Sequence, residues 1–210
     1  MTPKKTAILV LAAGGSSRMG TPKQLLPWKN TTLLGHVIEQ AELTSAPIVA
    51  VVTGSGAAAV KKSIKTEGIE VFVNLNWEKG IGNSIALGTK ALLEKYKDLD
   101  GILIILGDQP LVTAEYLEEL LRVASMVTKS IVASSYGNVP GVPAYYDSCY
   151  FDELMVLDAD SGGKSILKRN IRETYMLNAD AYLADTDTPE AYVKLHTEVF
   201  GYPPSGKLDE

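Results

Sequence analysis

The sequence has little cysteine, little histidine and no long apolar run. Its 210 residues include one cysteine, Cys149, and two histidines. A single cysteine excludes an intramolecular disulfide and a cysteine-rich zinc site, and we expect its side chain to be buried or half-buried as a small packing residue. No apolar run reaches the roughly 18 residues that a membrane-spanning helix needs, so we expect no membrane partner.

The sequence also has fewer basic than acidic residues. Twenty Lys and Arg residues against 25 Asp and Glu give a formal net charge of −5, which argues against binding to nucleic acid. A local anion site is still compatible with this balance, because a few backbone N–H groups and two or three cations suffice. The apolar stretch 7–13 is too short for a signal peptide and leads straight into glycines, so we expect a cytoplasmic protein.

Short β-branched apolar runs alternate with longer stretches in which apolar residues have helical spacing. This alternation predicts βαβ units and an α/β, three-layer Rossmann-like fold with a mostly parallel sheet. Residues 1–200 are expected to form a single domain and residues 201–210 a C-terminal tail. The predicted strands are Ala7–Leu11, Ile48–Thr53, Ile69–Val73, Ile102–Leu106, Ile131–Ser134, a short one at Val142–Tyr146 with antiparallel pairing, and Thr174–Leu177; the predicted helices are Thr32–Leu43, Gly56–Lys65, Asn83–Tyr96, Ala114–Val127, Ser161–Asn170 and Pro189–Val199.

A glycine-rich loop follows the first predicted strand, where ligands bind in open parallel sheets. Small residues let the backbone approach a ligand closely, and successive N–H groups can form a concave anion site. Arg18 and Lys23 add positive charge that could bind phosphate oxygens. The alternative is a plain loop with two solvated cations.

Two later segments also place polar residues beside predicted strand ends. Ser84 lies near the start of a predicted helix, after Gly80, and is either a helix N-cap or a ligand contact. Asp108 follows the strand Ile102–Leu106 and is either a turn residue or a ligand for Mg²⁺, which prefers carboxylate, water and phosphate oxygens.

The loop L-A-A-G-G-S-S-R-M-G-T-P-K-Q-L-L, residues 11–26, resembles the signature of the MobA-like nucleotidyltransferases, and most closely their molybdenum cofactor cytidylyltransferase branch. Three more segments match in family order: N-L-N-W-E-K-G-I-G-N-S at 74–84, G-D-Q-P at 107–110 and D-T-D-T-P-E at 185–190. The resemblance implies a fold of the nucleotide-diphospho-sugar transferase type and a loop that wraps around a nucleoside triphosphate. The residues it implies at the nucleotide are Leu11, Ala12, Ala13, Gly14, Gly15, Ser16, Arg18, Lys23, Gly80, Ser84 and Asp108, of which Arg18, Lys23 and Asp108 are assigned catalytic roles.

The resemblance also implies a second metal ligand in the last segment. By position we favour Asp187 over Asp185 as the partner of Asp108 in binding Mg²⁺. A second carboxylate is physically reasonable, because the metal bridges phosphate oxygens during an in-line displacement. The alternative is that Asp187 or Thr188 only caps the last helix.

Two segments of the second half resemble the family's acceptor-binding elements. Residues 141–146 resemble its G-x-P-x-x-F/Y strand and residues 157–167 its L-x-G-D-x-G-A-R-x-L-L segment, which assigns Pro143, Asp160, Gly162 and Lys164 to the acceptor. Lys164 stands where Arg is common, so it keeps the charge but loses bidentate reach. We therefore expect the acceptor geometry to depart from the family pattern.

The resemblance implies Mg²⁺-dependent transfer of CMP from CTP to the phosphate of molybdopterin cofactor, with release of pyrophosphate. Guanylyl transfer from GTP and transfer to another small phosphate are the enzymatic alternatives. A non-catalytic molybdenum cofactor carrier or maturation chaperone, with a molybdoenzyme as its partner, is the alternative from a different class.

Overall fold

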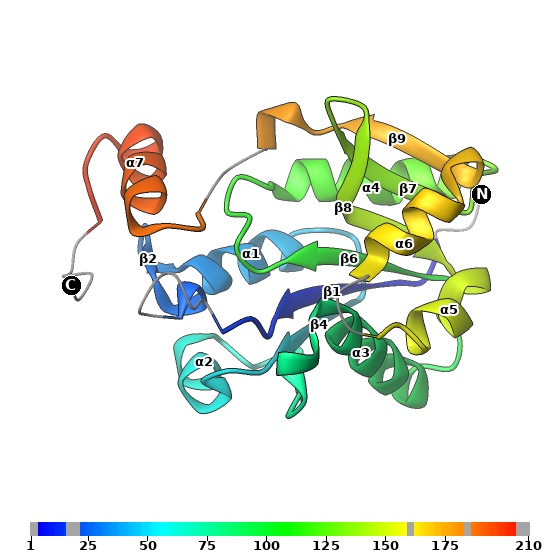
Figure 1. Ribbon diagram of the computed structural model, residues 1–210, viewed down its shortest axis with the longest axis horizontal. Coiled ribbons are helices and arrows are strands. Elements are labelled where there is room, and N and C mark those ends of the chain that lie inside the picture. The colour runs from blue at the N-terminus through cyan, green and yellow to red at the C-terminus, as the bar shows by residue number, and fades with distance from the viewer. Residues whose placement is uncertain (1–3, 16–21, 159–161, 183–185, 205–210) are drawn as a thin grey trace.

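The computed structural model describes residues 4–15, 22–158, 162–182 and 186–204 (Figure 1). Within them, one sheet of seven strands has the order β5-β4-β1-β6-β8-β7-β9, and a two-stranded sheet pairs β2 with β3. The strands are β1 Thr6–Ala12, β2 Pro27–Trp28, β3 Thr31–Thr32, β4 Ile48–Thr53, β5 Glu70–Val73, β6 Gly101–Leu106, β7 Ile131–Tyr136, β8 Val139–Asp147 and β9 Thr174–Asn178. The helices are α1 Leu33–Glu42, α2 Ala57–Ser63, α3 Ile81–Lys95, α4 Ala114–Met126, α5 Phe151–Met155, α6 Gly162–Arg169 and α7 Pro189–Phe200.

The large sheet is mostly parallel, as predicted. β1 pairs in parallel with β4 and β6, and β4 with β5 and β7 with β9 are parallel pairs too. β8 alone among these strands runs antiparallel to its neighbours, β6 and β7. It is longer than the predicted strand Val142–Tyr146, because a tight hairpin turn at Gly137 and Asn138, both with positive φ, continues the pairing with β7.

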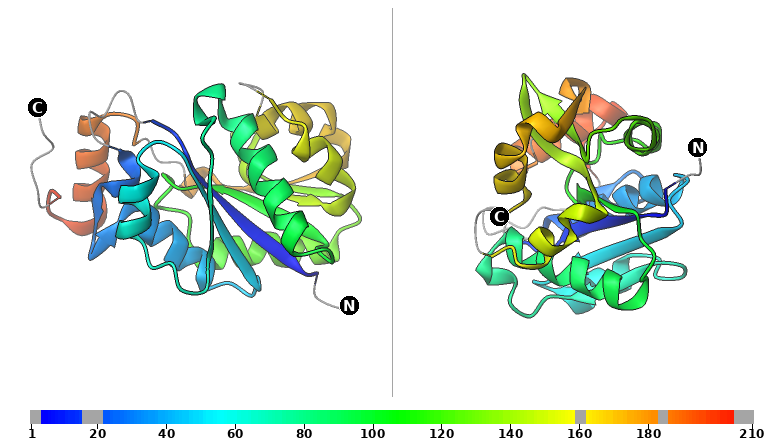
Figure 2. Two further views of the ribbon diagram at one scale, coloured as in Figure 1. Left: turned by 90° about the horizontal axis from the view of Figure 1, so that it is seen from below. Right: turned by 90° about the vertical axis from the view of Figure 1, so that its right-hand side faces the viewer.

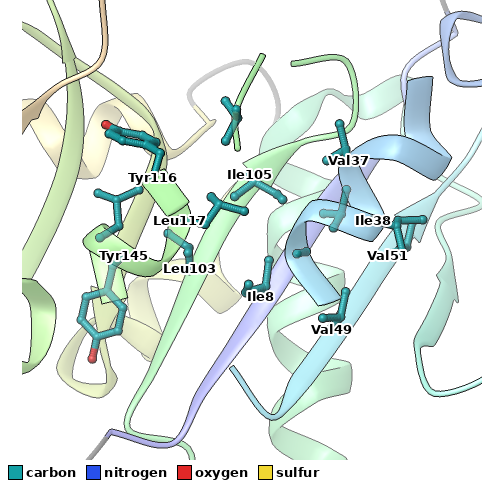
Figure 3. Close-up of a cluster of buried hydrophobic side chains, with 14 of the residues drawn as sticks. Ile8, Val37, Ile38, Val49, Val51, Leu103, Ile105, Tyr116, Leu117 and Tyr145 are labelled. Carbon is teal, nitrogen blue, oxygen red and sulfur yellow. The ribbon is translucent and has the colours of Figure 1, made fainter. Parts of the chain in front are cut away.

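Helices cover both faces of the sheet and make the three predicted layers (Figures 1 and 2). All seven residues of β1 are buried, as expected for a central parallel strand with helices on both sides. On one face, Ile8 and Val10 pack with side chains of α1, α2 and α4, and Figure 3 shows this cluster around Leu103 and Ile105. On the other face, Leu9 packs with side chains of α3, α5 and α6.

A third, smaller cluster joins the C-terminal helix to the segment after the glycine-rich loop. Trp28 of β2 packs with Tyr192 of α7, and its ring meets that of His196 edge-on at 5.6 Å between centroids. Figure 1 shows α7 beside β2, at the end of the molecule away from α5. The helix begins at Pro189 as predicted, whereas the short β2–β3 hairpin was not predicted from the sequence. The hairpin and α7 therefore bury each other's apolar side chains.

One sequence expectation is wrong at Cys149. Its side chain is exposed, whereas we expected it to be buried or half-buried. The reason is local: Cys149 lies in the short 3-10 turn Ser148–Tyr150 that follows β8, where Tyr150 and Phe151 point into the core instead. Among the described helices, none is both long enough and apolar enough to cross a membrane.

Candidate active site

A cavity of about 380 Å³ opens where β1 and β6 end. This is the carboxyl edge of the parallel strands, where ligands bind in open α/β sheets. Three segments that are far apart in the sequence meet there. The lining residues are Leu11, Ala12, Ala13, Gly14, Gly15, Lys23 and Gln24 from the first segment, Trp77, Glu78, Gly80, Ile81 and Ser84 from the second, and Leu106, Gly107 and Asp108 from the third.

The described part of the glycine-rich loop is held close to its neighbours. The Gln24 side chain is buried and its Nε2 donates to the carbonyl oxygens of Ala12 and Gly14, at 2.9 Å each. A Cβ on Gly15 would come within 2.8 Å of the Trp77 ring, and a Cβ on Gly54 within 2.5 Å of Trp77 Cβ. The loop can lie against Trp77 because glycine occupies these positions.

Ser84 is not a helix cap, so the N-cap alternative from the sequence is wrong. Helix α3 begins at Ile81, with Gly80 at the capping position and with a positive φ of 98°, which places Ser84 inside the first turn. The buried side chain of Asn74, just after β5, donates from Nδ2 to Ser84 Oγ at 2.9 Å. Ser84 therefore lines the cavity with its hydroxyl held in place by Asn74.

Lys23, Asp108 and Asp187 come together at one end of the cavity. Lys23 Nζ lies 3.5 Å from a carboxylate oxygen of Asp108 and also forms an ion pair with Asp187. The Lys23 side chain is 12% exposed, so its charge is held largely within the protein. Thr186 Oγ1 donates to the backbone oxygen of Asp108 at 3.1 Å, which ties the last segment to the turn after β6.

This arrangement separates the two interpretations of the segment before α7. Thr188 is the N-cap, since its side chain accepts a hydrogen bond from the N–H of Ala191 at 3.2 Å. The Asp187 carboxylate instead contacts Lys23. Asp185 lies outside the described residues, so the structure does not compare it with Asp187.

Asp108 and Asp187 have the chemistry of ligands for a hard divalent cation. Both offer carboxylate oxygens, and both lie beside the same lysine ammonium, so the two carboxylates face a common point. Within the described segments, no group of three or more His, Cys, Asp or Glu side chains could hold a metal ion. Two carboxylates fit a cation that also takes phosphate oxygens and water as ligands, which is the usual way that proteins bind Mg²⁺.

The described residues that were predicted to bind the acceptor do not line the cavity, in contrast to the described residues predicted to bind the nucleotide. A Cβ on Gly162 would lie 2.8 Å from Ile81 Cγ2, so the start of α6 abuts the cavity wall. Pro143 lies in β8, where its carbonyl accepts from Ser134 Oγ, and neither it nor the exposed Lys164 lines the cavity. Of the other predicted site residues, Ser16, Arg18 and Asp160 lie outside the described residues.

Three buried polar residues organise the site, and each lies in a segment that resembles the family although the sequence assigned it no role. Gln24 binds the loop carbonyls, Asn74 orients Ser84, and Thr186 binds the Asp108 turn. Asn74 shares one signal with Asp108, because each is a polar residue next to a strand's carboxyl end. No periodicity or spacing marks the other two residues: Gln24 binds carbonyls of its own loop, and Thr186 binds the carbonyl of Asp108, 78 residues away.

Comparison with known families places this site in context. The model of the MobA-like NTP transferase domain matches residues 8–174. The chain belongs to this family. The predicted nucleotidyltransferase class is thereby confirmed at the level of the MobA-like family, while the molybdenum cofactor cytidylyltransferase branch stays a prediction.

Solved structures agree over nearly the whole chain. Rv0371c from Mycobacterium tuberculosis H37Rv is 31% identical, with a TM-score of 0.80 over 93% of this chain and 98% of that one. A second structure of Rv0371c, in complex with manganese, has a TM-score of 0.74 over 92% of this chain and 98% of that one, at 28% identity. The predicted fold, a mostly parallel α/β sheet of the nucleotide-diphospho-sugar transferase type, is confirmed.

Curated relatives match a smaller part of the MobA-like chain. The bifunctional protein GlmU from Acinetobacter baylyi is 36% identical over 123 residues, which is 57% of this chain. The chain spans 26% of the length of that relative. The match therefore supports the shared domain and not the whole activity of GlmU.

Proposed function

We propose that this MobA-like protein transfers CMP from CTP to the phosphate of molybdopterin cofactor and releases pyrophosphate. The observation that supports this most is the convergence of Lys23, Asp108 and Asp187 at one end of a cavity with glycine-rich backbone along its wall. Phosphoryl chemistry needs positioned positive charge at the phosphates more than it needs a protein nucleophile. The donor nucleotide lies with its phosphates at this charged end.

The acceptor phosphate is the nucleophile and attacks the α-phosphorus of CTP in line. A new P–O bond forms as the bond to the leaving pyrophosphate breaks, and pyrophosphate takes the electron pair. Lys23 binds the phosphates and stabilises the negative charge that develops, and Arg18 in the same loop is assigned the same task from the sequence. Since the acceptor phosphate is already an anion near neutral pH, no side chain has to remove a proton from it.

Asp108 and Asp187 are the proposed ligands of Mg²⁺. The two carboxylates would hold a divalent cation, which would supply positive charge to the phosphates. The manganese complex of the Mycobacterium tuberculosis relative supports divalent cation use by this type of domain, and Mg²⁺ is our proposal for this chain. Thr186 positions Asp108 by donating a hydrogen bond to the backbone oxygen of Asp108.

The base is assigned to the backbone-lined part of the cavity, beside Leu11, Ala12 and Ala13, together with Gly80 and Ser84, which also line it. The acceptor is assigned to the side of Ile81, where Gly162 begins α6, together with Pro143, Asp160 and Lys164 from the sequence. The reaction is expected in the cytoplasm, with a molybdoenzyme as the recipient of the product. GTP as donor, another small phosphate as acceptor, and a cofactor carrier without catalysis are the competing functions.

The test uses the purified full chain, molybdopterin cofactor and Mg²⁺ or Mn²⁺ with each of CTP, GTP, UTP and ATP. Pyrophosphate release is measured, and thermal stabilisation by each nucleotide reports its affinity. We expect release and stabilisation to be greatest with CTP. Greatest turnover with GTP would establish the guanylyltransferase instead, and cofactor binding without pyrophosphate from any nucleotide would establish the carrier.

A further inference from the structure

The backbone carbonyls of the loop after β1 are already occupied. Leu11 O accepts from the N–H of Gly107 at 2.9 Å, and Ala13 O accepts from the N–H of Ser55 at 3.3 Å. Ala12 O and Gly14 O both accept from Gln24 Nε2, at 2.9 Å each. Four successive carbonyl oxygens at the cavity wall therefore have donors from within the protein.

Three N–H groups of the same loop, unlike its carbonyls, have no hydrogen-bond partner among the described residues. In the described ranges of the chain, the N–H groups of Ala13, Gly14 and Gly15 donate to no backbone or side-chain oxygen. All three residues line the cavity. This stretch of wall consequently offers hydrogen-bond donors and few unused acceptors, so it suits a ligand edge that carries acceptors.

Gln24 donates to two of these four carbonyl oxygens, and its side-chain amide has a fixed orientation. A carboxamide has two N–H hydrogens, and the two carbonyl oxygens take both. Turning the amide over would place Oε1 against two carbonyl oxygens, which is unfavourable. Oε1 is buried and has no hydrogen-bond partner among the described residues, so the position of Gln24 is set by its two donated bonds.

We propose that Gln24 is a positioning residue that makes the loop favour cytosine over guanine. The inference rests on the proposed function, in which this backbone faces the base. On its Watson–Crick edge, cytosine presents two adjacent acceptors, O2 and N3, and one donor, the N4 amino group, so it matches a row of N–H donors. Guanine presents one acceptor, O6, and two adjacent donors, N1–H and the N2 amino group, which would compete with Gln24 and its neighbours for the same carbonyl oxygens.

The test compares the dissociation constants of CTP and GTP, measured by calorimetry with Mg²⁺, in the full chain and in Gln24→Met. Methionine keeps the length and apolar stem of the side chain but donates no hydrogen bond. We expect the preference for CTP over GTP to fall about tenfold, since two carbonyls become available and the loop loses two bonds. Gln40→Met is the matched control, because Gln40 Oε1 accepts from the N–H of Ala114 and Gln40 does not line the cavity.

Two results would overturn the proposal. The first is an unchanged ratio of CTP to GTP affinity in Gln24→Met. The second is an equal weakening of CTP, GTP and free pyrophosphate, which would mean that the N–H groups face phosphates and not the base. If Gln24→Met does not fold, Gln24→Asn is measured with the same expectation, because its amide is one methylene too short to reach both carbonyls.

The same measurements distinguish this proposal from the proposed function. A wild-type chain that binds GTP more tightly than CTP would contradict cytidylyl transfer and, with it, the role given to Gln24. A wild-type preference for CTP that survives intact in Gln24→Met would leave cytidylyl transfer standing and remove Gln24 alone from base selection.

Discussion

Lys23 and Asp187 form an ion pair although 164 residues separate them in the chain. Asp108, from the middle of the sequence, lies 3.5 Å from the same ammonium nitrogen. The three residues meet because β1 and β6 are neighbours in the sheet and the segment before α7 is hydrogen-bonded to the turn after β6. This charged end of the cavity is thus assembled from three parts of the chain, and each part can be tested separately.

Asp108→Asn should abolish most of the activity while leaving the fold intact. The substitution removes the negative charge that would hold the metal, and we expect a loss of at least about 100-fold in turnover, by analogy with removal of other charge-stabilising groups. The side chain is 36% exposed and packs little, so the free energy of unfolding should change by less than about 0.5 kcal/mol. Turnover and urea unfolding check both, with the exposed Asp152→Asn as control. Near-full turnover in Asp108→Asn would refute the metal assignment.

Lys23→Met should weaken binding of the nucleoside triphosphate. Methionine fills the same space without the ammonium that we place at the phosphates, so the dissociation constant of CTP with Mg²⁺ should rise by about tenfold or more. Calorimetry measures it, and Lys61→Met on the surface of α2 is the control for loss of one positive charge. Equal CTP affinity in wild type and Lys23→Met would show that Lys23 does not bind the phosphates.

Thr186→Val should lower activity through the turn that holds Asp108. Valine keeps the shape of the buried threonine but cannot donate to the Asp108 carbonyl, at a cost of about 1 kcal/mol in stability. Turnover should fall as well, because the carboxylate is less well positioned. Thr186→Ser restores the hydroxyl and should recover activity. If Ser and Val behave alike, the hydrogen bond does not position Asp108.

Gly54→Ala should destabilise the protein by pressing on Trp77 and on the glycine-rich loop. Its Cβ would lie 2.5 Å from Trp77 Cβ and 2.7 Å from the Ala13 oxygen, so backbone has to move, at a cost of about 1–3 kcal/mol. Gly14→Ala is the comparison, because a Cβ there meets no atom within 4 Å and should leave stability nearly unchanged. Thermal unfolding of the two variants checks the difference. Equal stability would mean that Trp77 moves aside without cost.

Acidification should destabilise the protein through His36. Burial is the largest influence on this group and lowers its pKa, while Glu39 and the Pro110 backbone oppose that shift and Lys29 adds to it. The folded chain therefore favours neutral imidazole, whereas the unfolded chain takes up a proton at its ordinary pKa of about 6.5. The stabilisation is complete above that value and is lost as the pH falls through the lower folded pKa.

We accordingly expect the free energy of unfolding to fall as the pH drops below about 7 and on through the lowered folded pKa of His36, because the unfolded state binds more protons there. Urea titrations at several pH values measure the slope. His36→Gln should show a shallower slope over the same interval. An identical slope in the variant would assign the pH dependence to other groups.

Much of the fold could be predicted because its signals are local. β1 and β6 are continuous apolar runs buried on both faces, and the amphipathic stretches between strands became α1, α3 and α4. The β2–β3 hairpin was missed, because two-residue strands have no periodicity to detect. The full length of β8 was missed because Pro140 and Gly141 read as a loop, although the strand continues through them as the partner of β7.

The candidate site was predictable where residues follow strand ends. Asp108 lies in the turn directly after β6, and its place at the sheet edge follows from the topology. The role of Ser84 was harder to predict, because a serine caps a helix only if the helix begins directly after it. In the structure α3 begins earlier, at Ile81, with Gly80 at the capping position. Gln24 acts through the backbone of its own loop and Thr186 through the distant carbonyl of Asp108, and neither contact follows from a spacing in the sequence.

The two tryptophans occupy places with different optical environments. Trp77 is half-buried in the cavity wall against Gly15 and Gly54, whereas Trp28 is 2% exposed among Tyr192, His196 and Phe200. Emission from Trp77 is therefore expected to respond when a nucleotide enters, and emission from Trp28 when α7 separates from the hairpin. The two tryptophans are therefore expected to be separate fluorescent reporters, Trp77 of nucleotide binding and Trp28 of the packing between α7 and the hairpin, without any added label.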